Sequence, residues 1–98
     1  MFVIAYSYEA RDPEDFESVY GPNGDWSEFF RRGNGYVGTE LLRELENPGR
    51  YLVLDRWESR DAFDQFALEH QGEYFRRAEE AGLYYVQELQ LGVYQNVW

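Results

Sequence analysis

Four strand-like and two helix-like segments follow one another in the order strand, helix, strand, strand, helix, strand. Residues 2–8 are almost all apolar or aromatic, residues 36–45 alternate in polarity, and residues 50–57 follow a turn at 46–49. These patterns favour strands, the middle two forming a hairpin, and a final strand is expected from about residue 84 to 94. The order is that of the split βαβ arrangement, so we expect an α+β, ferredoxin-like βαββαβ fold with an antiparallel four-stranded sheet.

Both helix-like segments carry start and stop signals. Asp12 and Pro13 suit the N-cap and first turn of the first helix. Residues 21–24 interrupt this helix, and residues 25–28 resemble a capping box that restarts it, with Asp25 as the cap and Gly33 as the stop. The second helix is expected to begin after Ser59 or Asp61 and to end at Gly82. Its apolar stripe is Ala62, Phe63, Phe66, His70 and Tyr74.

The strands carry more apolar side chains than a sheet covered on one face requires. Residues 2–8 and 50–57 are apolar on both faces. In the last strand, alternation places Tyr85, Gln87, Leu89, Leu91 and Val93 on one face and Val86, Glu88, Gln90 and Tyr94 on the other. A chain of 98 residues forms one small domain, residues 1–98, with little enclosed volume. We therefore expect a homodimer through the sheet face opposite the helices.

The charge and the missing residue types exclude several classes of function. Nineteen acidic residues against nine arginines give a formal charge of -10, which repels phosphate backbones and anionic lipids, so neither nucleic acid nor membrane is expected as a partner. The longest apolar run, residues 2–6, is too short to span a membrane, and a cytoplasmic location is expected. Without cysteine or lysine, the chain has no thiol nucleophile, no cysteine metal site and no Schiff-base amine.

Several motifs are better explained by structure than by chemistry. Residues 33–38 match GxGxxG, but they lie between a helix and a strand, the reverse of the dinucleotide-binding context. Acid pairs on the expected helices do not converge, so no metal site is predicted. Asp55 and Glu88 interrupt strands and would need hydrogen bonds or arginine partners if buried, with Arg43 and Arg56 as candidates. The alternative, which the pattern favours, is a position on an edge strand or at the rim of the sheet.

Aromatic side chains surround the most plausible site. Helical spacing places Phe66, His70 and Tyr74 on one face, which should lie across the sheet that holds Tyr6 and Trp57. A pocket lined by phenols suits a flat, phenolic or quinone-like ligand. In this pocket a neutral His70 or a phenolate-stabilising tyrosine would accept a substrate proton near neutral pH. The alternative is that His70 is a packing residue.

The same residues resemble the antibiotic biosynthesis monooxygenase superfamily of dimeric α+β barrels. The resemblance rests on the strand ending in Tyr6 and Tyr8, on residues 24–42, on the Trp57-Glu58-Ser59 strand end followed by Ala62-Phe63, and on residues 88–94. It implies a two-fold dimer with a small-molecule pocket between each sheet and its helices. It also implies oxidation of aromatic compounds without metal or flavin, the deprotonated substrate itself reducing oxygen. Haem-degrading members have an asparagine and a ligating histidine where this chain has Ser7 and Glu79, and share only Trp57.

These observations predict a cofactor-independent monooxygenase that acts on a small aromatic or phenolic compound. The alternative is a non-catalytic small-ligand-binding or structural dimer module of the same fold, and haem degradation is disfavoured. No cofactor and no metal are expected. The predicted catalytic residues are His70, Trp57 and Tyr74. The predicted substrate-binding residues are Tyr6, Ser7, Phe66, Trp26 and Tyr36.

Overall fold

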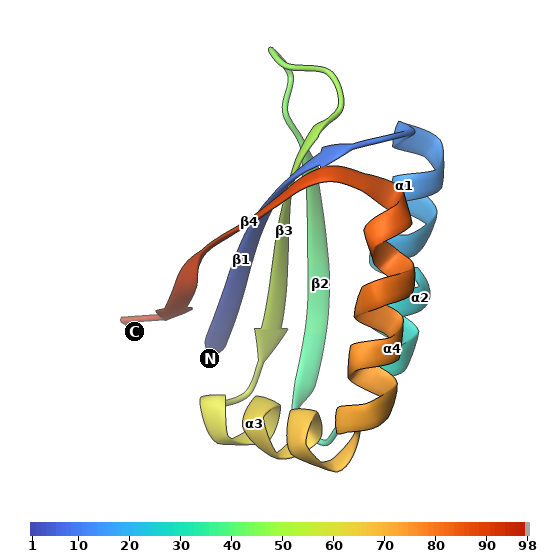
Figure 1. Cartoon of the computed structure of the whole chain (residues 1–98). Helices are drawn as coiled ribbons and strands as arrows, with labels where there is room; N and C mark the ends of the chain where they lie inside the picture. Colours follow the sequence, from blue (N-terminus) through green and yellow to red (C-terminus); the bar gives the residue numbers. More distant parts are fainter. Residues whose placement is uncertain (98) are drawn as a thin grey trace.

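The computed structural model describes residues 1–97 and confirms the predicted α+β, ferredoxin-like fold. Its elements are β1 (Phe2–Ala10), α1 (Pro13–Tyr20), α2 (Asp25–Phe30), β2 (Tyr36–Arg43), β3 (Arg50–Trp57), α3 (Arg60–Glu69), α4 (Gln71–Ala81), a 3₁₀ turn η1 (Gly82–Tyr84) and β4 (Tyr85–Gln95). The four strands form an antiparallel sheet in the order β2-β3-β1-β4. Helices α1, α2 and α4 cover one face of the sheet, and α3 lies at its end (Figure 1).

Two side-chain caps start helices where the sequence predicted them. Asp12 accepts a hydrogen bond from the Asp15 amide at 3.1 Å, and Ser59 accepts one from the Ala62 amide at 3.0 Å, so Ser59 is the cap of α3. Asp25, by contrast, is the first residue of α2 and not its cap. Gly24 occupies the capping position because a Cβ there would lie 2.5 Å from the carbonyl oxygen of Val19. The predicted capping box at Asp25 is therefore wrong.

The second predicted helix is two helices that meet at His70. His70 has φ -113° and ψ 26°, outside the helical region, and it ends α3 and precedes α4. Its amide still donates to the Phe66 carbonyl and its carbonyl accepts from the Tyr74 amide, so few backbone hydrogen bonds are lost. The turn carries the chain from the end of the sheet onto its face (Figure 1).

Irregular pairing in β4 changes which of its side chains face the helices. Ala5 pairs with Gly92 but Tyr6 pairs with Gln90, which leaves Leu91 as a bulge. A second irregularity near Val86 brings Tyr85 opposite Ala10. Paired residues on neighbouring strands share a face of the sheet. The two register shifts therefore make the predicted strict alternation of faces along β4 wrong. The helix-covered face receives Tyr85, Glu88, Gln90 and Val93, and the opposite face receives Leu89, Gly92 and Tyr94.

Two aromatic clusters form the core between the sheet and the helices. The buried members of the first are Tyr8, Phe16, Val19, Tyr20, Tyr51, Val53 and Ala81. Those of the second, nearer α3, are Phe2, Ile4, Phe29, Phe30, Trp57 and Phe66. Tyr6 and Trp26 pack against both clusters, so the site described below lies where the two meet.

The opposite face of the sheet leaves apolar side chains exposed. Leu42 on β2 and Leu89 on β4 expose 41% and 55% of their surfaces. This is the face predicted to form a homodimer. Within residues 1–97, no helix is long and apolar enough to cross a membrane.

Candidate functional site

A cavity of about 150 Å³ lies between the sheet and helices α2 and α4. Its walls are aromatic rings, and two carboxylates are its charged groups. The lining residues are Tyr6, Tyr8, Tyr20, Trp26, Phe30, Val53, Asp55, Tyr74, Ala78, Tyr85 and Glu88.

The periodicity of each element explains this lining. On β1 and β3 the residues alternate, so Tyr6 and Tyr8 point to the helices beside Val53 and Asp55. On α2 and α4 they are four apart, which puts Trp26 with Phe30, and Tyr74 with Ala78, on one helix face. The bulged strand β4 supplies Tyr85 and Glu88. With Tyr20 at the end of α1, six elements therefore meet at one small space.

Asp55 is the one buried carboxylate among the described residues, with 8% of its surface exposed. The Thr39 hydroxyl donates to its Oδ1 at 2.6 Å, and the Tyr36 hydroxyl contacts Thr39 Oγ1 in turn. Its Oδ2 accepts no hydrogen bond from a described residue. Burial raises the pKa of Asp55 to about 6, although the Thr39 hydrogen bond opposes the rise. Asp55 can therefore gain or lose a proton near neutral pH.

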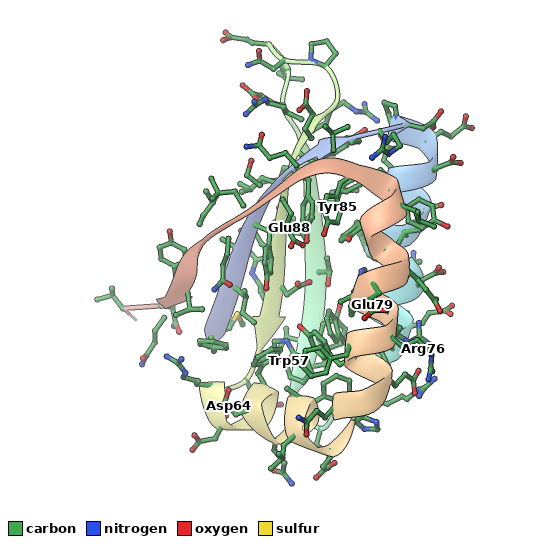
Figure 2. All side chains as sticks on the ribbon, viewed as in Figure 1. Trp57, Asp64, Arg76, Glu79, Tyr85 and Glu88 are labelled. Carbon is green, nitrogen blue, oxygen red and sulfur yellow. The ribbon has the colours of Figure 1, made fainter. Side chains whose placement is uncertain are left out.

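Glu88 is the second carboxylate and lies at the solvent-exposed edge formed by β4. The Tyr8 hydroxyl donates to its Oε2 at 2.6 Å. Burial, followed by Tyr20 and Glu88, raises the pKa of Tyr8 far above its ordinary value. Figure 2 shows Glu88 and Tyr85 together, near the C-terminal end of α4. The partners of Asp55 and Glu88 are thus hydroxyls and not the predicted arginines, since Arg43 and Arg56 pair with Glu17 and Glu40.

Tyr6 and Tyr74 present hydroxyls that are free to meet a ligand. Neither hydroxyl forms a hydrogen bond with a described residue. Burial, then the nearby Asp55 charge, raises the pKa of Tyr6 to about 12. Burial, then Tyr6 and Asp55, also raises the pKa of Tyr74. Both side chains are therefore neutral hydrogen-bond donors at neutral pH.

The structure gathers three of the eight predicted site residues at the cavity: Tyr6, Trp26 and Tyr74. Trp57, Phe66 and Tyr36 do not line the cavity. They belong to the cluster nearer α3, against which Tyr6 and Tyr74 also pack, and Trp57 lies at the end of the sheet beside α3 (Figure 2). The indole nitrogen of Trp57 is buried without a hydrogen-bond partner among the described residues. Ser7 pairs with Leu52 and Leu89, on the face opposite the helices.

His70 does not line the cavity. Its ring packs 4.6 Å from the Phe66 ring and 5.9 Å from the Phe29 ring, centroid to centroid. Phe29 also contacts Tyr74, at 6.1 Å. Trp57, Tyr6 and Tyr74 thus pack in one cluster, as predicted, but His70 does not reach the cavity, because the chain turns at His70 and Phe29 packs against both helices there.

The sequence contained a signal for the residues that the prediction missed. Asp55 and Glu88 are acids within otherwise apolar or aromatic strands, a pattern that favours a buried polar site. Their shared cavity could not be predicted because it depends on the bulge at Leu91, which sets the face of Glu88. Among residues 1–97, no three histidine, cysteine or acidic side chains are placed to hold a metal ion.

Comparisons with known proteins agree on one family. A model of the antibiotic biosynthesis monooxygenase family matches residues 27–81. The crystal structure of SnoaB, a cofactor-independent oxygenase from Streptomyces nogalater, superposes with a TM-score of 0.79 at 22% identity, covering 99% of this chain and 93% of that one. No curated protein sequence matches the chain.

Two further solved structures share the fold. A candidate antibiotic biosynthesis monooxygenase from Nitrosomonas europaea has a TM-score of 0.71 at 13% identity, with 100% of both chains covered. Another, from Bordetella bronchiseptica, has a TM-score of 0.69 at 20% identity, with 99% of this chain and 97% of that chain covered. At these identities the structural similarity establishes the fold.

Proposed function

The chain belongs to the antibiotic biosynthesis monooxygenase family, and from that premise we propose that it is a cofactor-independent oxygenase of a small phenolic compound bound in the cavity. The observation that carries the proposal is the buried Asp55 carboxylate, with a pKa of about 6, in a space walled by aromatic rings. The similar fold of SnoaB, a cofactor-independent oxygenase, supports it.

Asp55 is the proton acceptor in this proposal. Its free Oδ2 removes the proton from the phenol hydroxyl, a role within reach of a carboxylate with this pKa. His70 was predicted for this role, but it lies outside the cavity. The hydroxyls of Tyr6 and Tyr74 then donate hydrogen bonds to the oxygen atoms that become negatively charged.

The substrate supplies every electron that oxygen requires. The phenolate transfers one electron to O₂, and recombination of the two radicals forms a bond from a ring carbon to oxygen, giving a peroxide. That carbon then loses its hydrogen as a proton while the O–O bond breaks, which leaves a carbonyl group and releases water. The balance is phenol plus O₂ to quinone plus water, with four electrons taken from the ring. The protein contributes positioning and proton transfer.

We also propose that the active form is a homodimer. The support is the exposed apolar face of the sheet, which includes Leu42 and Leu89. A second copy of the same face would remove these side chains from water.

Oxygen consumption tests the proposed activity. The purified protein is supplied with catechols, hydroquinones and hydroxyanthrones, and oxygen uptake is measured above the rate of spontaneous oxidation. Asp55→Asn should lower kcat by about 100-fold or more, the usual scale for loss of a general base. Glu14→Gln, which removes an equal charge from the exposed first turn of α1, should leave kcat unchanged. Full activity in Asp55→Asn would overturn the role of Asp55. Tight binding without turnover would favour the non-catalytic ligand-binding module.

A further inference from the structure

The charge of the cavity restricts what it can bind. Asp55 and Glu88 both contribute to raising the pKa values of Tyr6 and Tyr74, so both carboxylates act on the same enclosed space. The lining contains no arginine, lysine or histidine. Helix α4 carries two arginines: Arg77 is held by Glu73 at 2.8 Å, and Arg76 is exposed and does not line the cavity. An anionic ligand would thus meet two negative charges without a compensating cation.

The walls of the cavity form a nearly continuous set of aromatic faces. The Tyr8 ring lies 4.7 Å from the Tyr20 ring and 5.3 Å from the Tyr85 ring. Trp26 contacts Tyr20 at 6.5 Å and Tyr74 at 5.5 Å, centroid to centroid. Ring faces of tyrosine and tryptophan attract cations, and aromatic cages with a carboxylate are a recurring means of binding ammonium groups.

The two carboxylates lie at different ends of this space. Asp55 is paired to Ile4 and Glu88 to Tyr8, on either side of β1. Four residues along the strands, roughly 13 Å, and two spacings between strands, roughly 10 Å, place the two backbone positions roughly 16 Å apart. Asp55 is buried, whereas Glu88 lies at the exposed edge. A ligand can therefore place one end at Asp55 and the other at Glu88.

The cavity has room for about one ring below its exposed edge at Glu88. The cavity measures about 150 Å³, below the range of roughly 300–1,000 Å³ that holds drug-sized ligands. We propose that the cavity selects single-ring phenols that carry an ammonium group, with the phenol hydroxyl at Asp55 and the ammonium group against Glu88 and the rings of Tyr8 and Tyr85. This inference rests on the proposed function, because it takes the cavity as the substrate site.

Three probes of similar shape and different charge test the inference. They are tyramine, which is cationic, 4-ethylphenol, which is neutral, and 3-(4-hydroxyphenyl)propanoate, which is anionic. Binding is measured by calorimetry without oxygen at pH 7.5, so that the result does not depend on turnover. Tyramine should bind about tenfold more tightly than 4-ethylphenol, the scale of a cation–π contact combined with a partly exposed ion pair. The anionic probe should bind more weakly than either.

Variants identify the side chain responsible. Glu88→Gln should reduce the preference for tyramine over 4-ethylphenol to less than about threefold, because it removes the ion pair at the edge. Glu14→Gln makes the same change in net charge outside the cavity and should preserve the preference. Equal or tighter binding of the anionic probe, an unchanged preference in Glu88→Gln, or no binding of any probe would each overturn the inference. If the inference fails but uncharged phenols still cause oxygen uptake, the proposed oxygenase function stands without the ammonium preference. If tyramine is preferred but no phenol causes oxygen uptake, the ligand preference stands and the oxygenase function is refuted.

Discussion

Asp55→Asn should make the protein more stable while it abolishes the proposed activity. Burial raises the pKa of Asp55 from 3.8 to about 6, so the folded protein holds this proton more tightly than the unfolded chain does. The contribution of Asp55 to stability is therefore greatest at low pH and falls as the pH rises from about 4 through about 6. The rise corresponds to roughly 3 kcal/mol of lost stability once Asp55 is ionised, at 1.36 kcal/mol for each tenfold change in the ionisation constant. Asparagine is isosteric, never ionises and still accepts the Thr39 hydrogen bond.

The assay is urea unfolding of both proteins at equal concentration between pH 5 and pH 8. The gain in unfolding free energy of Asp55→Asn should be about 1.5 kcal/mol at pH 5 and about 3 kcal/mol at pH 8. Because the wild type and Asp55→Asn are compared at the same pH, the titration of the other carboxylates affects both proteins equally and cancels. A difference that does not grow with pH, or a variant less stable than the wild type at pH 8, would refute the reasoning that Asp55 is strained by burial.

Three further substitutions test the packing and the proposed assembly. Gly33→Ala should destabilise the fold by about 1–3 kcal/mol, because its Cβ would lie 2.6 Å from the Phe66 ring, whereas Gly72→Ala, with no atom within 4 Å, should be neutral or slightly stabilising in the same unfolding assay. His70→Ala should lower the unfolding free energy by about 1 kcal/mol, because the ring contacts with Phe66 and Phe29 are lost, and should leave kcat per folded molecule unchanged. A fall in kcat of about 100-fold would instead identify His70 as the general base. Leu89→Glu should shift the sedimentation coefficient from that of a dimer to that of a monomer at micromolar concentration. The control Leu68→Glu, at an exposed site on α3, should leave it unchanged. Equal sedimentation of both variants would contradict an interface through the sheet.

The strands and most helix boundaries could be predicted because they depend on local signals. Asp12 and Ser59 act as caps through hydrogen bonds to residues three positions ahead, and the hairpin turn at 46–49 is a matter of residue type. The turn at His70 escaped prediction because the four-residue spacing of the apolar stripe continues across it. The chain turns there to pass from the end of the sheet to its face, which is a tertiary requirement.

The site was less predictable than the fold because its chemistry depends on long-range pairing. His70 attracted attention because it is the one histidine of the chain, and histidine is a common general base. Asp55 reaches that range because the structure removes it from water. No local pattern reports the depth at which a side chain is buried. The sequence therefore identified Asp55 as an interior acid but did not indicate that burial raises its pKa.

The bulges at the two edges of the sheet bear on how this chain behaves when crowded. Pairing shifts by one residue between Tyr36 and Gly38 on β2 and at Leu91 on β4, so neither outer strand is a regular extended ribbon. Bulges increase local twist and make an edge a poor template for another strand. The irregular edges therefore disfavour edge-to-edge growth of copies into fibres, although the opposite sheet face exposes apolar side chains such as Leu42 and Leu89. The proposed face-to-face association, in contrast, would close after two copies.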